Sequence, residues 1–254
     1  MRNKFILKKN TLESFSSKEI DIVDSHIVFK KNGDYVLEYE NCSHVNLDIS
    51  VMDDVMVKLF IFSRDNDVDI CNHYVLGKRS NLMLFQFYDN KNVHENTVID
   101  LDGENSKFYQ GFSSISRGCE EYHIVVNHNK MGVCSDIRNK CIALDGSDIS
   151  IQIDSNLEKG NSSCVMDQVS RILTFGDVRA KIIPNMFIEE DSVEARHGSI
   201  IGSFDEEEVF YLMSRGISRE EAILLLIKGF LFSNIVVDLE KREFIMRSIL
   251  KLRR

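Results

Sequence analysis

The chain has 254 residues, 43% hydrophobic and 28% charged, which is an ordinary globular composition and excludes a disordered protein. With 31 basic and 40 acidic residues, the formal net charge of −9 argues against nucleic-acid binding, because a negative surface repels phosphate backbones. No run of about 18 uncharged apolar residues occurs, so we expect no membrane-spanning helix. The first ten residues are too poor in apolar side chains for the core of a signal peptide, and we expect a cytoplasmic protein.

The cysteine spacing argues against the common small metal and redox motifs. No C-x-x-C pair occurs, which speaks against a zinc ribbon or a thioredoxin motif. We expect reduced thiols, most of them small buried hydrophobic residues, at Cys42, Cys71, Cys119, Cys134, Cys141 and Cys164. Cys71 and His73 would share one face of a strand, because side chains alternate with period two. Two ligands do not complete a metal site.

From about residue 20 to residue 200 the pattern predicts short β-strands separated by tight turns. Segments 55–63 and 82–88 are rich in β-branched and aromatic residues, and segment 148–154 alternates isoleucine with polar residues. Clusters of Asn, Asp, Gly and Ser between the segments favour turns. Many short strands indicate a sandwich, a barrel or a β-solenoid, and periodicity alone does not choose among them. No exact repeat is visible, so a solenoid would have irregular coils.

After residue 204 the pattern becomes helical. Asp205 is a good N-cap with Glu208 placed to return a capping bond, and Gly216 is a typical stop for that first helix. Ser218 and Glu221 form a capping box that begins a second helix.

The second helix is apolar on nearly all sides as far as Ile235, and a third helix is expected over 239–252. A helix of this kind must be covered on more than one face. Either it packs between the strands and the third helix, or a partner protein covers it, and the two arrangements are compatible.

Known chemical motifs are mostly absent from the sequence. It contains no phosphate-binding G-x-x-x-x-G-K-[ST], no G-x-G-x-x-G and no G-x-S-x-G nucleophile motif. The acidic runs 189–191 and 206–208 fit a solvated turn and a helix N-terminus. His197 lies between the last strand pattern and the first helix, and is followed by Gly198. A histidine there can act as a neutral metal ligand or a proton carrier.

Segment 184–231 resembles the C-terminal signature of the SufB/SufD scaffold proteins of iron–sulfur cluster assembly. It reads PNMFIEEDSVEARHGSIIGSFDEEEVFYLMSRGISREEAILLLIKGFL. The family pattern has a proline-led strand, an acidic turn with valine, a histidine–glycine pair and an apolar helix ending in Gly-Phe. The matching positions include Pro184, Ile188, Asp191, Val193, His197, Gly198, Gly202, Asp205, Glu206, Ala222, Gly229 and Phe230. A weaker resemblance extends upstream through His128, Ser135, Gly146 and the strand 171–175.

The resemblance implies a mainly β fold: a right-handed parallel β-helix (β-solenoid) in residues 1–202 and a C-terminal α-helical domain in residues 203–254. It further implies that the family's N-terminal helical region is missing from this chain. The implied function is a SufD-like scaffold subunit without turnover of its own. Its partners would be a SufB-like paralogue, or a second copy of itself, and a SufC-like ABC-type ATPase. A cysteine desulfurase or sulfur carrier would supply sulfur indirectly, and the cargo would be a transient iron–sulfur cluster.

The resemblance also assigns residue roles. The pair His197–Gly198 matches SufD-like chains, whereas SufB-like chains carry His-Glu at this place. His197 would face the partner's cysteine at a shared cluster site and is the tentative metal ligand, since imidazole is a credible iron ligand beside thiolate. SufD-like members often carry a cysteine two residues earlier, where this chain has Ala195. The ATPase would dock on Phe210, Tyr211, Ser214, Arg215, Gly216, Ile217, Ile227, Phe230 and Leu231.

Two other functions remain open from the sequence. One is a β-helical interaction module without metal chemistry, which differs from the scaffold only at His197. The other is a β-helical enzyme acting on polysaccharides, for which we would expect a groove lined by several Asp and basic residues together with a signal peptide. The first 110 residues match no motif.

Overall fold

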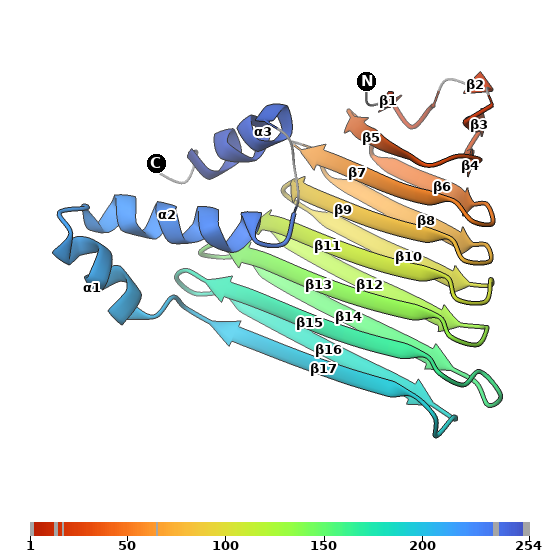
Figure 1. Cartoon of the computed structure of the whole chain (residues 1–254). Coiled ribbons are helices and arrows are strands. Elements are labelled where there is room, and N and C mark those ends of the chain that lie inside the picture. The colour runs from red at the N-terminus through yellow and green to blue at the C-terminus, as the bar shows by residue number, and fades with distance from the viewer. Residues whose placement is uncertain (1–2, 13–14, 17, 65, 236–238, 251–254) are drawn as a thin grey trace.

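The computed structural model describes residues 3–250 apart from 13–14, 17, 65 and 236–238. In this part of the chain the strands form two stacked, mainly parallel sheets (Figure 1). Sheet A contains β1 (Asn3–Lys8), β5 (Gly33–Glu40), β7 (Met56–Arg64), β9 (Asn81–Asp89), β11 (Lys107–Ser116), β13 (Cys134–Ala143), β15 (Val165–Thr174) and β17 (Glu194–Gly202). Sheet B contains β2 (Phe15–Ser16), β3 (Ile20–Val23), β4 (His26–Phe29), β6 (His44–Val51), β8 (Val68–Leu76), β10 (Val93–Leu101), β12 (Cys119–His128), β14 (Asp148–Leu157) and β16 (Arg179–Ile188).

From β4 onward the chain alternates between the two sheets, so that each coil contributes one strand to each sheet. This arrangement is a parallel β-solenoid, as the family resemblance implied, and it decides among the three architectures that periodicity left open. The alternation predicted for segment 148–154 is confirmed, because Ile149, Ile151 and Ile153 are fully buried while the residues between them face outward. Parallel, in-register pairing stacks the inward residues of successive coils into columns.

The coils differ in length, which explains the absence of an exact sequence repeat. One inward column runs through register partners on consecutive strands of sheet A, separated by 25, 26, 27, 31 and 29 residues: Leu59, Leu84, Gln110, Ile137, Gln168 and His197. The turns absorb the differences in length, since the strands themselves remain in register. His197 is therefore the last residue of a column that begins deep in the core.

In the described part of the chain, three helices follow the last strand: α1 (Glu206–Ser214), α2 (Arg219–Phe232) and α3 (Leu239–Leu250). The carboxylate of Asp205 caps α1 by accepting a hydrogen bond from the backbone N–H of Glu207. Ser218 and Glu221 form the predicted capping box of α2. The expected third helix is observed as far as Leu250, and its last two positions lie outside the described residues. Among the described residues, none of the helices combines the length and the hydropathy that a membrane span requires.

Helices α2 and α3 pack on the outer face of sheet A (Figure 1). This face is apolar, and it shares one buried cluster with the helices, formed by Val36, Phe60, Phe62, Phe85, Phe87, Ile115, Ile142 and Leu173 from the sheet and Ile227, Phe230, Leu231, Ile235, Ile245 and Ile249 from the helices. We expected the apolar second helix to be covered by packing within the chain, by a partner protein, or by both. The structure shows the packing within the chain.

Polar contacts join the C-terminal end of α2 to β11 and β13. Gly111 faces outward on β11, and a Cβ atom there would lie 2.2 Å from the carbonyl oxygen of Asn234. Glycine at this position therefore lets the chain after α2 approach the sheet backbone. The buried side chain of Asn234 donates to the carbonyl oxygens of Phe112, at 2.9 Å, and Arg138. The hydroxyl of Ser113 donates to the Leu231 carbonyl at 3.5 Å.

Candidate functional site

His197 lies at the open end of the solenoid. It is on β17, which pairs only with β15 among the described strands, and its register partner is Gln168. In earlier coils an inward residue at this position is covered by the next coil. No described coil follows β17, so the imidazole is exposed, and it makes no hydrogen bond or ion pair with any described residue.

The polar side chain of Gln168 lies beneath His197 and is held in place by hydrogen bonds. Its side chain is 1% exposed and crosses the interior, where Nε2 donates to Ser155 Oγ at 2.6 Å and to the Asn185 carbonyl at 3.3 Å. The first bond links sheet A to sheet B within the coil before the last, and the second links β15 to β16 of the last coil. The imidazole of His197, next to the Gln168 side chain, is free to bind a ligand supplied from outside the chain.

The residues beside His197 leave space and supply no thiolate. Position 195, two residues before the histidine, is alanine and carries no thiol, and its register partner on β15 is Met166. A Cβ atom on Gly198 would meet only Val169, at 3.9 Å, and packing within the chain therefore does not require glycine there. Within the described residues, no group of three His, Cys, Asp or Glu side chains is placed to hold a metal ion. The cluster-site role of His197 stays a prediction.

The six cysteines divide by exposure rather than gathering at this end. Cys42, Cys141 and Cys164 are buried, Cys134 is half-buried, and Cys71 and Cys119 are exposed on the outer face of sheet B. Burial is the main cause that raises the pKa of Cys141 above its ordinary value. Cys71 and His73 share an outer face of β8 as predicted, and among the described residues no group of three side chains there is placed to hold a metal ion.

The last coil exposes apolar side chains and two free strand edges. In the described chain, β16 pairs only with β14 and β17 only with β15, which leaves unpaired backbone N–H and C=O groups on both. Large apolar side chains of this coil are also exposed, namely Phe187, Ile188, Ile200 and Ile201. Free edges combined with exposed apolar residues are typical of an interaction surface.

The predicted docking residues on α1 and the following turn lie at the surface. Phe210 is 72% exposed and Tyr211 is 58% exposed. The Arg215 guanidinium lies 5.2 Å from the centre of the Tyr211 ring and donates to its hydroxyl at 3.2 Å, while Ser214 Oγ donates to the Tyr211 carbonyl at 2.7 Å. Gly216, with φ +86°, reverses the chain, and Ile217 is half-buried.

The other three predicted docking residues lie in the core between helix and sheet. Ile227 and Leu231 are buried, and Phe230 is 9% exposed. Their side chains pack against sheet A and do not form part of an outer surface in this structure. Two exposed apolar residues of the same helices, Met213 and Leu225, were not singled out from the sequence.

Comparison with protein families identifies the chain. A family model described as "SUF system FeS cluster assembly, SufBD core domain" matches residues 24–230. The chain belongs to the SufB/SufD family. The matched family is one of the SUF system of iron–sulfur cluster assembly, and the match covers the solenoid from β4 onward and the helices as far as Phe230 in α2.

Curated relatives of this SufB/SufD-family chain agree with that assignment. An iron–sulfur cluster assembly SufBD family protein of Mycobacterium leprae is 53% identical over 60 residues, which are 23% of this chain and 15% of the relative. The SufD protein of Bacillus subtilis is 42% identical over 76 residues, 30% of this chain and 17% of the relative. A SufBD family protein of Pyrococcus horikoshii is 34% identical over 96 residues, 36% and 20% of the two chains. The aligned segments thus span at most a fifth of these relatives.

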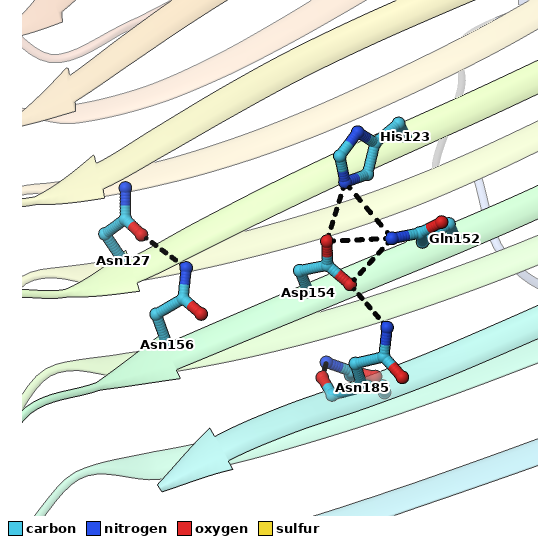
Figure 2. Close-up of polar contacts among 7 residues, drawn as sticks. His123, Asn127, Gln152, Asp154, Asn156 and Asn185 are labelled. Atoms are coloured by element: carbon cyan, nitrogen blue, oxygen red, sulfur yellow. Dashed lines mark hydrogen bonds and ion pairs between the residues drawn. The ribbon is translucent and has the colours of Figure 1, made fainter. Parts of the chain in front are cut away.

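A ladder of histidine–carboxylate pairs crosses the outer face of sheet B, and sequence reasoning missed it. Nitrogen–oxygen distances are 3.2 Å for His26–Asp48, 2.7 Å for His73–Asp100 and 2.7 Å for His123–Asp154 (the last in Figure 2). Asn127 and Asn156 add an amide pair beside the last of these (Figure 2). In the sequence, each of these histidines is followed by an aspartate on the next coil, and this spacing is the signal that could have revealed the pairs.

The solenoid interior of this SufB/SufD-family chain also holds titratable side chains. Glu120 Oε2 accepts hydrogen bonds from Tyr122 at 2.9 Å and Ser114 at 3.0 Å, and burial raises the pKa of Glu120 to about 7. His128 and Ser135, two positions of the weaker upstream resemblance, lie 2.9 Å apart in the core. Burial lowers the pKa of His128 to about 4, so its imidazole is neutral at physiological pH.

Proposed function

We propose that this chain is a SufD-like scaffold subunit that shares a nascent iron–sulfur cluster with a partner subunit at its terminal coil. The proposal rests on one observation above all: His197 is an inward column residue left uncovered at the open end of the solenoid. The name of the Bacillus subtilis relative, SufD, and the His197–Gly198 pair support the SufD-like assignment. The chain itself has no turnover in this proposal, and the cluster is its cargo.

The partner at this coil is a SufB-like chain or a second copy of this one. Free edges on β16 and β17 offer backbone hydrogen bonds in both sheets, and the exposed Phe187 and Ile200 offer apolar area beside them. A partner coil placed there would cover His197 and could supply the thiolates that this chain lacks around it. Sulfur would reach the site from a cysteine desulfurase or sulfur carrier.

An ABC-type ATPase of the SufC kind is the second proposed partner, docked on α1 and the turn after it. Phe210 and Tyr211 are large, exposed and unsupported by sheet A, which is unusual for aromatic side chains without a partner. The buried residues Ile227, Phe230 and Leu231 would act indirectly, by fixing α2 on the sheet so that α1 is held in place.

An anaerobic pull-down of the tagged chain from its native lysate, with mass spectrometry of the bound proteins, is the first test. Recovery of an ABC-type ATPase together with a SufB-like chain supports the proposal. Recovery of this chain alone, at high yield, contradicts the proposed partners.

His197→Ala tests the cluster role in the reassembled complex. We expect the complex to form normally while its iron and sulfide content falls roughly tenfold or more, the scale of losses at metal ligands and their supports. His44→Ala is the matched control, since His44 is an exposed histidine on the outer face of sheet B. Unchanged iron and sulfide in the His197 variant would favour the interaction module without metal chemistry.

Phe210→Asp tests the ATPase dock. We expect the variant to fold and to lose ATPase binding, while Met131→Asp, at an exposed turn far from the helices, keeps it. Phe230→Asp is unsuitable for this test, because Phe230 lies in the core between α2 and sheet A. Full ATPase binding by the Phe210 variant would refute docking on α1.

A further inference from the structure

Two cations lie side by side on the outer face of sheet A, at the C-terminal end of α2. Lys140 on β13 and Arg171 on β15 are register partners on adjacent strands. Both lie over the ring of Phe230, with Lys140 Nζ 5.4 Å and Arg171 Cζ 5.5 Å from its centre. Lys140 also donates to the hydroxyl of Ser233, the C-cap residue of α2. Both side chains are partly exposed, so solvent reaches this place.

Neither cation has a carboxylate partner within the described residues. Their neighbour Arg138 shows the contrast, because it bonds to Asp136 at 2.5 Å and to Asp167 at 2.8 Å. Nε of Arg171 is buried and has no acceptor. Burial and the nearby charges of Arg171 and Arg138 lower the pKa of Lys140. In a protein of net charge −9, two adjacent cations without an acid form an uncompensated positive site.

The helix terminus accounts for only part of this charge. The last turn of α2 contains no basic residue of its own, so Lys140 and Arg171 face its negative end from sheet A, and Arg242 of α3 lies 5.2 Å from the centre of the Phe232 ring in the same turn. A helix terminus carries about half an elementary charge, against two full positive charges here. Roughly one and a half positive charges therefore remain uncompensated beside the Phe230 ring.

We propose that Lys140, Arg171 and the Ser233 hydroxyl bind a doubly charged oxyanion of the phosphate class. A guanidinium donates two parallel hydrogen bonds to such an anion, and an ammonium adds a point charge from the adjacent strand. Ser233 Oγ provides a further donor once its proton turns from the Phe230 carbonyl, to which it donates at 2.7 Å. Ile200, the register partner of Arg171 on β17, is exposed and leaves the approach from that side open.

The test measures binding of inorganic phosphate to the full chain at mildly alkaline pH, where phosphate is mainly a dianion, with ionic strength held constant by chloride. Calorimetric titration and the shift of the unfolding temperature are read in parallel. We expect phosphate to bind and to raise the unfolding temperature of the wild type. Lys140→Gln and Arg171→Gln should each weaken binding roughly tenfold or more, the effect of one charge-assisted hydrogen bond. Lys107→Gln, on the same face of sheet A, should bind like the wild type.

Three outcomes would overturn the proposal. If phosphate neither binds to the wild type nor stabilises it, the two cations serve the helix terminus alone. Equal phosphate binding by the wild type and both variants would mean that the anion binds elsewhere. Equal stabilisation by acetate would mean that a single carboxylate suffices, against the doubly charged ligand proposed. Since the readouts require neither cluster assembly nor an ATPase, they are independent of the scaffold function.

Discussion

A matched pair of Gly→Ala substitutions tests how α2 and α3 are held on the solenoid. Gly111 lies under the chain that follows α2, whereas Gly229 lies within α2 and has nothing within 4 Å of its added Cβ. The same chemical change should therefore have opposite effects at the two positions. At Gly111 the methyl group would meet the Asn234 carbonyl oxygen at 2.2 Å and the Phe85 ring at 3.0 Å.

The magnitudes follow from these contacts. Overpacking of this kind costs about 1–3 kcal/mol. Displacing Asn234 also breaks its hydrogen bond to the Phe112 carbonyl, which costs about 1 kcal/mol. Alanine in a strand regains roughly 0.5 kcal/mol over glycine. We therefore expect Gly111→Ala to lower the free energy of unfolding by about 1.5–3.5 kcal/mol, and Gly229→Ala to raise it by about 0.5–1 kcal/mol.

Thermal unfolding followed by far-ultraviolet circular dichroism measures both variants. For a chain of this length, the Gly111 change corresponds to a fall of about 3–14 °C in the unfolding temperature. Hydrogen exchange locates the effect, since the amides of α2 and α3 should exchange faster in the Gly111 variant while those of β12 and β14 change little. An unfolding temperature equal to that of the wild type for Gly111→Ala, or shifts of the same sign in both variants, would refute the reasoning.

Three further predictions concern titratable groups. Because burial raises the pKa of Glu120 from 4.5 to about 7, its contribution to stability is present below the first value and lost as the pH rises through the second. Glu120→Gln should therefore gain roughly 3 kcal/mol over the wild type in urea unfolding between about pH 4 and pH 8, and no relative gain would contradict this. The pKa of His128 is lowered from 6.5 to about 4, so His128→Gln should lose less stability than the wild type on acidification through that range. Burial favours the neutral form of Asp154, but hydrogen bonds from His123 and two amides prevail and lower its pKa; His123→Ala should raise that pKa in a carboxyl NMR titration.

Local features of the fold were predictable because they depend on neighbours in sequence. The alternation in segment 148–154, the caps at Asp205 and Ser218, and the change from strand to helix after Gly202 all follow from side-chain period and capping chemistry. The prediction of a solenoid came from the family resemblance. The two-residue alternation along a strand predicts which face of the sheet a side chain lies on. It does not predict which other strand pairs with that strand.

The features that sequence reasoning missed depend on residues one or more coils apart. The pair His123–Asp154 joins residues 31 positions apart, and the turns that set this spacing vary from coil to coil. The burial of Phe230 was equally hidden, because the apolar outer face that it covers is assembled from several strands. His197 was predicted from its place in the sequence and from the resemblance. Its neighbour Gln168 can be identified only once the strand register is known.

The two ends of the solenoid differ in the strand edges that they offer to another chain. At the N-terminal end, sheet B stops being parallel at β4, because β3 pairs with it antiparallel and β2 pairs antiparallel with β3 (Figure 1). A parallel coil arriving there could not continue both sheets at once. At the other end, β16 and β17 are both free and parallel to their neighbours. Two chains joined through their terminal coils would turn the antiparallel strands β2 and β3 outward, so the described part of sheet B would offer no further parallel edge to another coil.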